Sequence, residues 1–180
     1  MKPEYYICVP ILLFVPACSP SGGEDSAAPD LADITEYYEV TGEGLWEGTW
    51  EYTAHQAAVR VLQPSTSTFT EQFVDLDEAQ ASYEMAAVVD LKTNAFTFAF
   101  EDGSYEGSGT FYGDAWDWYA WESTSLHEDG SSVVSQDTKK GDDIFVSKVG
   151  YDAEGQEQWT MEEVLTAITE AEWLALQESR

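Results

Sequence analysis

Cysteine is nearly absent from this 180-residue chain, and both copies, Cys8 and Cys18, lie close to its amino terminus. A framework of disulfide bonds within the residues that follow Cys18 is therefore excluded. Catalysis by a cysteine thiolate is excluded from the same region, because the thiolate is the reactive form of this side chain. The 43% hydrophobic and 14% aromatic content is high enough to build a packed core without covalent cross-links.

Basic residues are scarce as well: 7 lysines and arginines face 35 acidic residues, for a net charge of −28. Nucleic acids and anionic lipid headgroups both require a basic surface, so neither is expected as a partner. Repulsion between like charges keeps a protein soluble, and we expect a monomer. The acidity has two interpretations: a specific role in binding cations or basic partners, or a solvated surface suited to saline surroundings. The even spread of the acids along the chain favours the second.

The groups that usually carry catalysis are few. The two histidines, His55 and His127, are expected at the end of the first strand and in a hairpin turn. No G-x-S-x-G motif is present, and the acidic runs at 75–78 and 152–155 do not complete a calcium loop. The glycines of "GSYEGSGTF" (103–111) lack the lysine of a phosphate loop and are expected at bends or barrel corners. We therefore expect no catalytic residue, no metal and no cofactor, and a protein that is not an enzyme.

The first residues resemble a bacterial lipoprotein signal. Ile7–Val15 is an apolar run of signal-peptide length, far too short to span a bilayer. Val15, Ala17 and Cys18 match the aliphatic, small and cysteine positions of the lipobox. The resemblance implies that residues 1–17 are removed and that Cys18 carries acyl chains, which together anchor a protein stably in a membrane. Ordinary secretion is the alternative, and it would leave Cys18 as a free thiol.

The residues after the lipobox complete this expectation. Ser19 is similar to the enterobacterial pattern for sorting to the outer membrane, so we expect a protein anchored at the bacterial cell envelope, on the outer membrane facing the periplasm or the exterior. Residues 18–33 are rich in Ser, Gly, Pro, Ala and acids, which predicts a flexible acidic tether. A short helix is expected through "ITEYYEV" (34–40), and the folded domain is assigned to 34–180.

Alternation of apolar and polar residues dominates from Leu45 onward, as in "SYEMAAVVDL" (82–91) and "AFTFAF" (95–100). Short turn sequences separate these runs. Thr169 and Glu172 have capping-box spacing, which predicts a C-terminal helix of about ten residues. The expected strands are 45–54, 57–63, 67–76, 82–92, 95–101, 104–112, 115–124, 131–137, 143–150 and 156–168.

This pattern predicts an all-β fold: a single antiparallel up-and-down barrel of about 8–10 strands with a short C-terminal helix. A β-sandwich is the alternative. Acidic residues at outward positions, Glu84, Asp90 and Asp117, argue against the continuous apolar band of an outer-membrane barrel.

One stretch, "GLWEGTWEY" (44–52), resembles the first strand of lipocalins and lipocalin-like barrels. Gly48, Thr49 and Trp50 match the G-x-W triplet of that strand, and Trp46 offers a second arrangement with Gly48. The resemblance implies a lipocalin-like barrel in which this tryptophan packs across the closed end. Lipocalins also cover the tryptophan with a late arginine, whereas the arginines of this chain are Arg60 and Arg180.

Aromatic residues are the main candidates for ligand binding. If they point inward, they either line a cavity for an apolar guest or fill the barrel completely. Glu71 lies between Phe69 and Phe73 on one face of a strand, where it would bind the polar end of a ligand or, as an edge-strand acid, meet water. Tyr119 and Trp121 are expected on the outer face. The candidate ligand-binding residues are Trp46, Trp50, Glu71, Phe96, Phe98, Trp116 and Trp118.

Two functions follow from these expectations. The first is a membrane-anchored lipoprotein that binds a small apolar ligand or lipid in the barrel lumen. The second is a structural or interaction lipoprotein with a filled barrel and a partner-binding outer surface.

Overall fold

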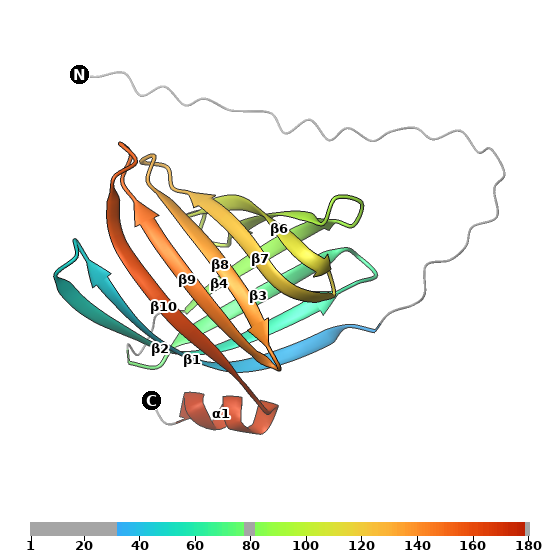
Figure 1. Ribbon diagram of the computed structural model, residues 1–180. Coiled ribbons are helices and arrows are strands. Elements are labelled where there is room, and N and C mark those ends of the chain that lie inside the picture. Colours follow the sequence, from blue (N-terminus) through green and yellow to red (C-terminus); the bar gives the residue numbers. More distant parts are fainter. Residues whose placement is uncertain (1–31, 78–81, 179–180) are drawn as a thin grey trace, which may run out of the picture.

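The structure is a computed structural model that describes residues 32–77 and 82–178 (Figure 1). The predicted signal peptide 1–17, Cys18 and all but the last two residues of the predicted tether lie outside the described residues. The described elements are β1 (Ile34–Trp46), β2 (Trp50–Gln63), β3 (Thr68–Asp75), β4 (Ser82–Asp90), β5 (Ala95–Phe100), β6 (Glu106–Asp114), β7 (Asp117–Leu126), β8 (Ser132–Lys140), β9 (Asp143–Tyr151), β10 (Glu157–Ile168) and α1 (Glu170–Glu178).

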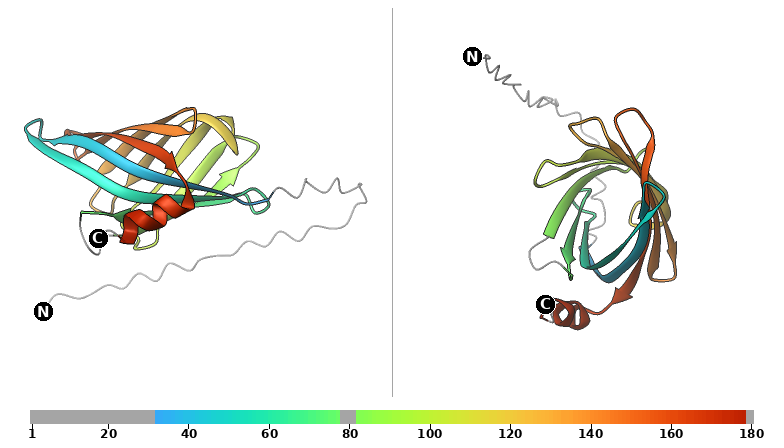
Figure 2. Two further views of the ribbon diagram at one scale, coloured as in Figure 1. Left: turned by 90° about the horizontal axis from the view of Figure 1, so that it is seen from below. Right: turned by 90° about the vertical axis from the view of Figure 1, so that its left-hand side faces the viewer.

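The strands form one closed antiparallel barrel of the up-and-down type. Each strand pairs with the next in the chain, and β1 also pairs with β10, from Tyr37 opposite Ile168 to Trp46 opposite Trp159. Closure leaves no edge strand among these ten. The predicted barrel is therefore confirmed, and the alternative sandwich is wrong. Figure 2 (right) shows the ring of strands seen from one end.

The first strand begins at Ile34 and not at residue 45 as predicted, so the G-x-W triplet lies at the β1–β2 turn and not within the first strand. The segment expected to form a short helix at 34–40 belongs to β1, in which Tyr38 and Val40 point into the core. Ile, Thr, Tyr and Val favour extended backbone, and the alternation in this segment is that of a strand. The expected first strand at 45–54 is in fact the tip of a hairpin, where Glu47 and Gly48 adopt positive φ angles and Trp46 pairs with Trp50. Figure 1 shows this hairpin extending beyond the neighbouring strands.

Glycines in the strands make room for aromatic rings. Gly109 stands directly opposite Phe96, and Gly107 directly opposite Phe98, on neighbouring strands. A Cβ atom at either glycine would overlap the opposite ring, so each phenylalanine lies flat over its glycine. Gly150 and Trp159 form the same kind of pair between β9 and β10.

The interior is packed at one end of the barrel. This closed end is where β1 begins and where the β2–β3, β4–β5, β6–β7 and β8–β9 connections lie. Its core is a cluster of touching aromatic rings, in which Phe69 and Phe111 contact Trp121, and Trp118 stacks on Trp121 with ring centroids 5.1 Å apart. Aliphatic side chains from β2, β4 and β9 complete this packing: Leu62, Val89 and Ile144.

The C-terminal helix begins with the predicted capping box. The Thr169 backbone N–H donates to Glu172 Oε2 over 2.8 Å, and the Glu172 N–H donates to Thr169 Oγ1 over 3.3 Å. Helix α1 then lies outside the barrel against β1 and β2, with the Trp173 ring 5.5 Å from that of Tyr37 (Figure 1). No helix in the described part of the chain is long and apolar enough to cross a membrane.

Candidate ligand-binding site

A cavity of about 390 Å³ occupies the other half of the barrel interior. Its lining includes Tyr83 at the start of β4, Phe100 at the end of β5, Val133 near the start of β8 and Trp159 near the start of β10. These positions lie at the end opposite the packed aromatic core, which we call the open end. The volume is within the range of natural sites for small molecules.

One wall of the cavity is apolar and largely aromatic. Strand alternation turns every second residue of β3, β4 and β5 inward, so that rings from three neighbouring strands form one continuous surface. Phe73 stacks on Tyr83 with ring centroids 5.0 Å apart, and Phe98 meets Phe100 edge to face. The inward side chains of this wall, which we call the aromatic wall, are Phe73, Tyr83, Met85, Phe96, Phe98 and Phe100.

The opposite wall mixes polar and apolar side chains. Strands β7 to β10 turn serines, acids and one lysine toward the same space, between apolar residues: Trp121, Val133, Val146, Trp159 and Leu165. Its hydrogen-bonding side chains, which we call the polar wall, are Ser123, Ser125, Ser135, Asp137, Lys148 and Glu163.

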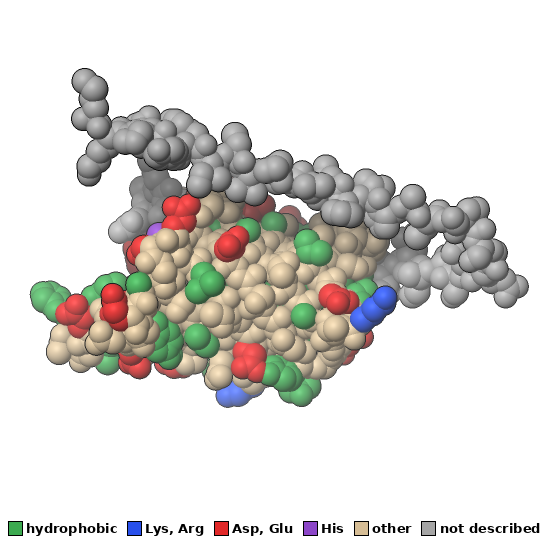
Figure 3. Space-filling model, turned by 90° about the horizontal axis from the view of Figure 1, so that it is seen from above, with side chains coloured by type: hydrophobic (Ala, Val, Ile, Leu, Met, Phe, Trp, Pro, Cys, Tyr) green, Lys and Arg blue, Asp and Glu red, His purple; other side chains and the backbone are tan. Residues whose placement is uncertain are grey.

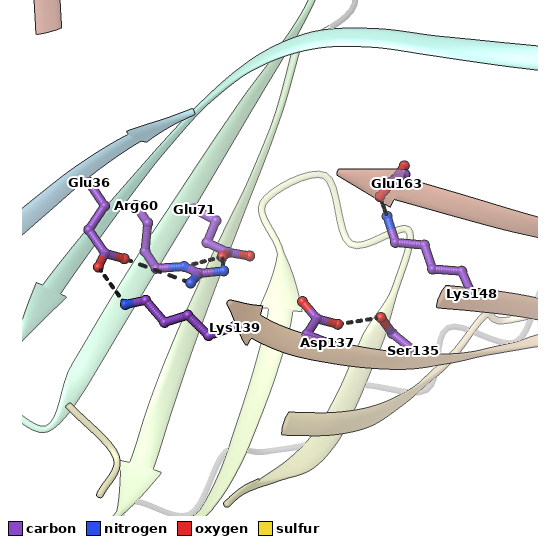
Figure 4. A network of polar contacts seen from close by, with 8 residues as sticks. All are labelled: Glu36, Arg60, Glu71, Ser135, Asp137, Lys139, Lys148 and Glu163. Atoms are coloured by element: carbon purple, nitrogen blue, oxygen red, sulfur yellow. Dashed lines mark hydrogen bonds and ion pairs between the residues drawn. The ribbon is translucent and has the colours of Figure 1, made fainter. Parts of the chain in front are cut away.

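An ion pair between Arg60 and Glu71 closes the base of the cavity (Figure 4). Arg60 is only 2% exposed, and its Nε donates to Glu71 Oε1. Its guanidinium carbon also lies 4.8 Å from the ring centre of Trp121 and 5.3 Å from that of Trp118. Burial opposes the charged form, yet the carboxylate of Glu71 and its neighbours hold the pKa of Arg60 above its ordinary value.

A second charged pair joins β9 to β10 beside the cavity. Lys148 Nζ donates to Glu163 Oε2 over 2.6 Å, and Glu163 is buried. Burial alone would lower the pKa of Lys148, but the charge of Glu163 raises it above the ordinary value. Lys148 is therefore already neutralised by a partner of its own, as Arg60 is.

Asp137 lies between these two pairs, as Figure 4 shows. It is 5% exposed, and its Oδ1 accepts a hydrogen bond of 2.7 Å from the Ser135 hydroxyl. Loss of hydration raises its pKa to about 6, although Ser135, the indole of Trp121 and the charge of Arg60 favour the ionised form. At neutral pH the lumen thus contains an ionised carboxylate that is largely removed from water.

The structure places the seven predicted ligand-binding residues in three environments. Glu71, Phe96 and Phe98 line the cavity, so Glu71 is the inward acid rather than the solvent-exposed alternative. Trp118 is buried in the packed core, and the partly buried Trp116 packs against that core, but neither lines the cavity.

The other two do not reach the cavity. Trp46 and Trp50 lie at the tip of the β1–β2 hairpin, 47% and 72% exposed. The prediction that Trp50 packs across the closed end is therefore wrong. It failed because β1 begins about ten residues before the expected strand, which puts the G-x-W triplet in the turn.

Trp121 was expected on the outer face, but it is buried and lines the cavity. The reason is a bulge: Tyr112 pairs with Ala120 and Gly113 with Trp118, so Tyr119 has no partner and the alternation of β7 shifts by one residue. Tyr119 is exposed, as expected.

Arg60, Asp137 and Lys148 were not recognised from the sequence. The scarcity of basic residues could have drawn attention to Arg60 and Lys148, both of which line the cavity. No signal in the sequence distinguishes Asp137 from the other acids.

Neither histidine lines the cavity. His55 is on the face of β2 opposite to that of Arg60, and its Nε2 lies 3.1 Å from Glu39 Oε1. The His127 ring, in the β7–β8 connection, meets edge to face the ring of Tyr105, which does line the cavity. Within residues 32–77 and 82–178, no group of three or more potential metal-binding side chains comes together. The chain matches no protein-family model and no curated protein.

Proposed function

We propose that this protein is a membrane-anchored lipoprotein of the bacterial cell envelope whose barrel binds a small apolar molecule or lipid. The observation that carries the proposal is the cavity of about 390 Å³ at the open end, with phenylalanine rings on one side and hydrogen-bonding groups on the other. Natural ligand sites combine apolar walls with a small number of polar groups in this way. The packed core at the closed end gives the cavity a rigid base.

Membrane anchoring rests on Val15, Ala17 and Cys18, and it is tested separately from ligand binding. In a bacterial host that processes lipoproteins, the wild-type chain is expected in the membrane fraction and carries added acyl mass. Cys18→Ser is expected to move the protein to the soluble fraction and to abolish the added mass. Cys8→Ser is the matched control, since Cys8 precedes the cleavage position, and it is expected to behave as wild type. Equal fractionation of Cys18→Ser and wild type would instead support ordinary secretion.

Ligand binding is tested by native mass spectrometry of the protein gently extracted from the envelope in which it is made. An extra mass that is released on denaturation is expected, and its identification names the ligand. Ser125→Trp is expected to lower the occupied fraction at least tenfold, because Ser125 is buried and lines the cavity, and an indole there fills the space.

Thr124→Trp provides the matched control, because Thr124 is the exposed neighbour on the same strand and points away from the lumen. It is expected to retain the extra mass. If wild type and both variants are all recovered without added mass, even after incubation with membrane lipids, the lumen does not bind such a ligand.

A second candidate function is docking of a partner protein on the outer surface. Leu45, Trp46 and Trp50 are exposed together at the hairpin tip, and hydrophobic side chains gather at that end of the face in Figure 3. Elsewhere on this face acidic side chains are scattered rather than gathered into one patch (Figure 3), which favours the interpretation of the acidity as a general surface property.

A further inference from the structure

Three buried carboxylates line the cavity, and their partners differ. Glu71 pairs with Arg60, and Glu163 pairs with Lys148. Asp137 lies on β8 between these two pairs and accepts a hydrogen bond from the Ser135 hydroxyl. Among the described residues, no cationic group lies within 4 Å of the Asp137 carboxylate. An ionised carboxylate removed from water is stabilised best by a cation at hydrogen-bond distance.

The charge balance of the lumen also disfavours an anionic guest. The cations that line it, Arg60 and Lys148, are each held by a carboxylate of the chain. A fatty acid or a phosphate headgroup would have to displace Glu71 or Glu163 from its partner, and removing one member of a buried pair leaves the other uncompensated. The net charge of −28 further repels anions and attracts cations over longer distances.

The shape of the cavity places an apolar group opposite Asp137. Asp137 and Ser135 are on the polar wall, while the aromatic wall on β3–β5 faces the same space. An extended molecule with a hydrocarbon body and one polar end therefore fits with its body against the rings and its polar end at Asp137. Further hydroxyl groups, those of Ser123 and Ser125, are available around such an end.

We propose that the lumen selects amphipathic amines, with the ammonium group paired to Asp137 and the hydrocarbon chain against the aromatic wall. This inference rests on the proposed ligand-binding function and specifies the chemical class of the ligand. The ammonium group would supply the one counter-charge that the buried groups of the lumen lack.

The test compares three probes that share one ten-carbon chain: decylamine, 1-decanol and decanoate. At pH 7.5 the amine is a cation, the alcohol is neutral and the acid is an anion. Their dissociation constants are measured by calorimetry on the full chain carrying Cys18→Ser, so that no detergent competes for the cavity. Decylamine is expected to bind at least tenfold more tightly than 1-decanol, and decanoate more weakly than both.

Asp137→Asn is expected to reduce the affinity for decylamine at least tenfold while leaving that for 1-decanol unchanged, since the amide keeps the size of the side chain. Asp102→Asn is the matched control, because Asp102 is an exposed carboxylate at the rim of the same cavity. It is expected to change the affinity for the amine less than twofold.

The outcomes separate the two proposals. If none of the three probes binds, the ligand-binding function itself fails. If 1-decanol or decanoate binds as tightly as decylamine, or if Asp137→Asn weakens all three probes equally, the lumen binds apolar chains but the inference of an amine ligand is overturned.

Discussion

Arg60→Met is expected to lower the free energy of unfolding by about 3–5 kcal/mol, the usual effect of removing one partner from a buried ion pair. Arg60 is 2% exposed and Glu71 is 6% exposed, so the variant would leave the Glu71 carboxyl group without its ion-pair partner in a site with little access to water. Methionine retains an apolar stem against Trp118 and Trp121 but cannot replace the cation that lies over both rings. Urea denaturation followed by tryptophan fluorescence measures the loss as a shift in midpoint.

The double variant Arg60→Met/Glu71→Gln separates the charge from the packing. Replacing Glu71 as well removes the carboxylate that Arg60→Met leaves without a partner. The double variant is therefore expected to regain much of the free energy of unfolding that Arg60→Met loses. Lys148→Met is the comparison at the other pair, and it is expected to lose less, because Lys148 is about a quarter exposed. A double variant as unstable as Arg60→Met would mean that the stacking of the guanidinium, and not the ion pair, stabilises the base of the cavity.

The strands were predictable wherever alternation was strict. The expected ranges at 82–92, 95–101 and 143–150 lie within one or two residues of β4, β5 and β9. Prediction failed at β1, where the segment 34–40 after the tether was interpreted as a short helix. It failed again at β7, where Tyr119 is a bulged residue. Beyond the bulge, each side chain of the strand points to the face opposite to the one that strict alternation predicts.

The candidate site was predictable only in part, for a related reason. Alternation within one strand places Phe96 and Phe98 on the same face, and Glu71 on the face of Phe69 and Phe73. It left open whether Glu71 points inward or meets water. Which end of the barrel is packed depends on ring contacts between strands far apart in the sequence, such as Phe69 with Trp121. The pairing of Arg60 with Glu71, and the lack of such a pairing at Asp137, likewise arise from register across the barrel. A pattern read along one strand contains none of this information.

Asp137→Asn is expected to raise the free energy of unfolding at pH 7.5 by up to about 3 kcal/mol. Burial raises the pKa of Asp137 from 3.8 to about 6, and each unit of such a difference corresponds to about 1.4 kcal/mol. Because the folded protein binds this proton more tightly than the unfolded chain, the contribution of Asp137 to stability is greatest below pH 3.8. It is lost as the pH rises through about 6. The amide is always neutral and so avoids that loss.

The free energy of unfolding of Asp137→Asn and of the wild type is measured from pH 4 to pH 7.5. The difference between the two values isolates the contribution of the Asp137 charge. Arg60, Glu71, Lys148 and Glu163 line the same cavity as Asp137 and are present in both proteins, so their contributions to the free energy of unfolding cancel to first order. The gain from Asp137→Asn is therefore expected to grow between about pH 4 and pH 6 and then to level off. Asp102→Asn is expected to give no gain at any pH, since hydrogen bonds from Ser104 hold the pKa of Asp102 below its ordinary value.

If Asp137→Asn is more stable than the wild type and also binds decylamine at least tenfold more weakly, both effects have one cause: a carboxylate held ionised in the lumen without a cation from the chain at hydrogen-bond distance. At one saturating concentration, decylamine is then expected to stabilise the wild type at pH 7.5 by at least about 1.4 kcal/mol more than Asp137→Asn, because a tenfold larger dissociation constant lowers the stabilisation by that amount. If the free energies of unfolding of the two proteins differ by the same amount at every pH, water already compensates the charge of Asp137. The ammonium group of a ligand would then have no uncompensated charge to neutralise.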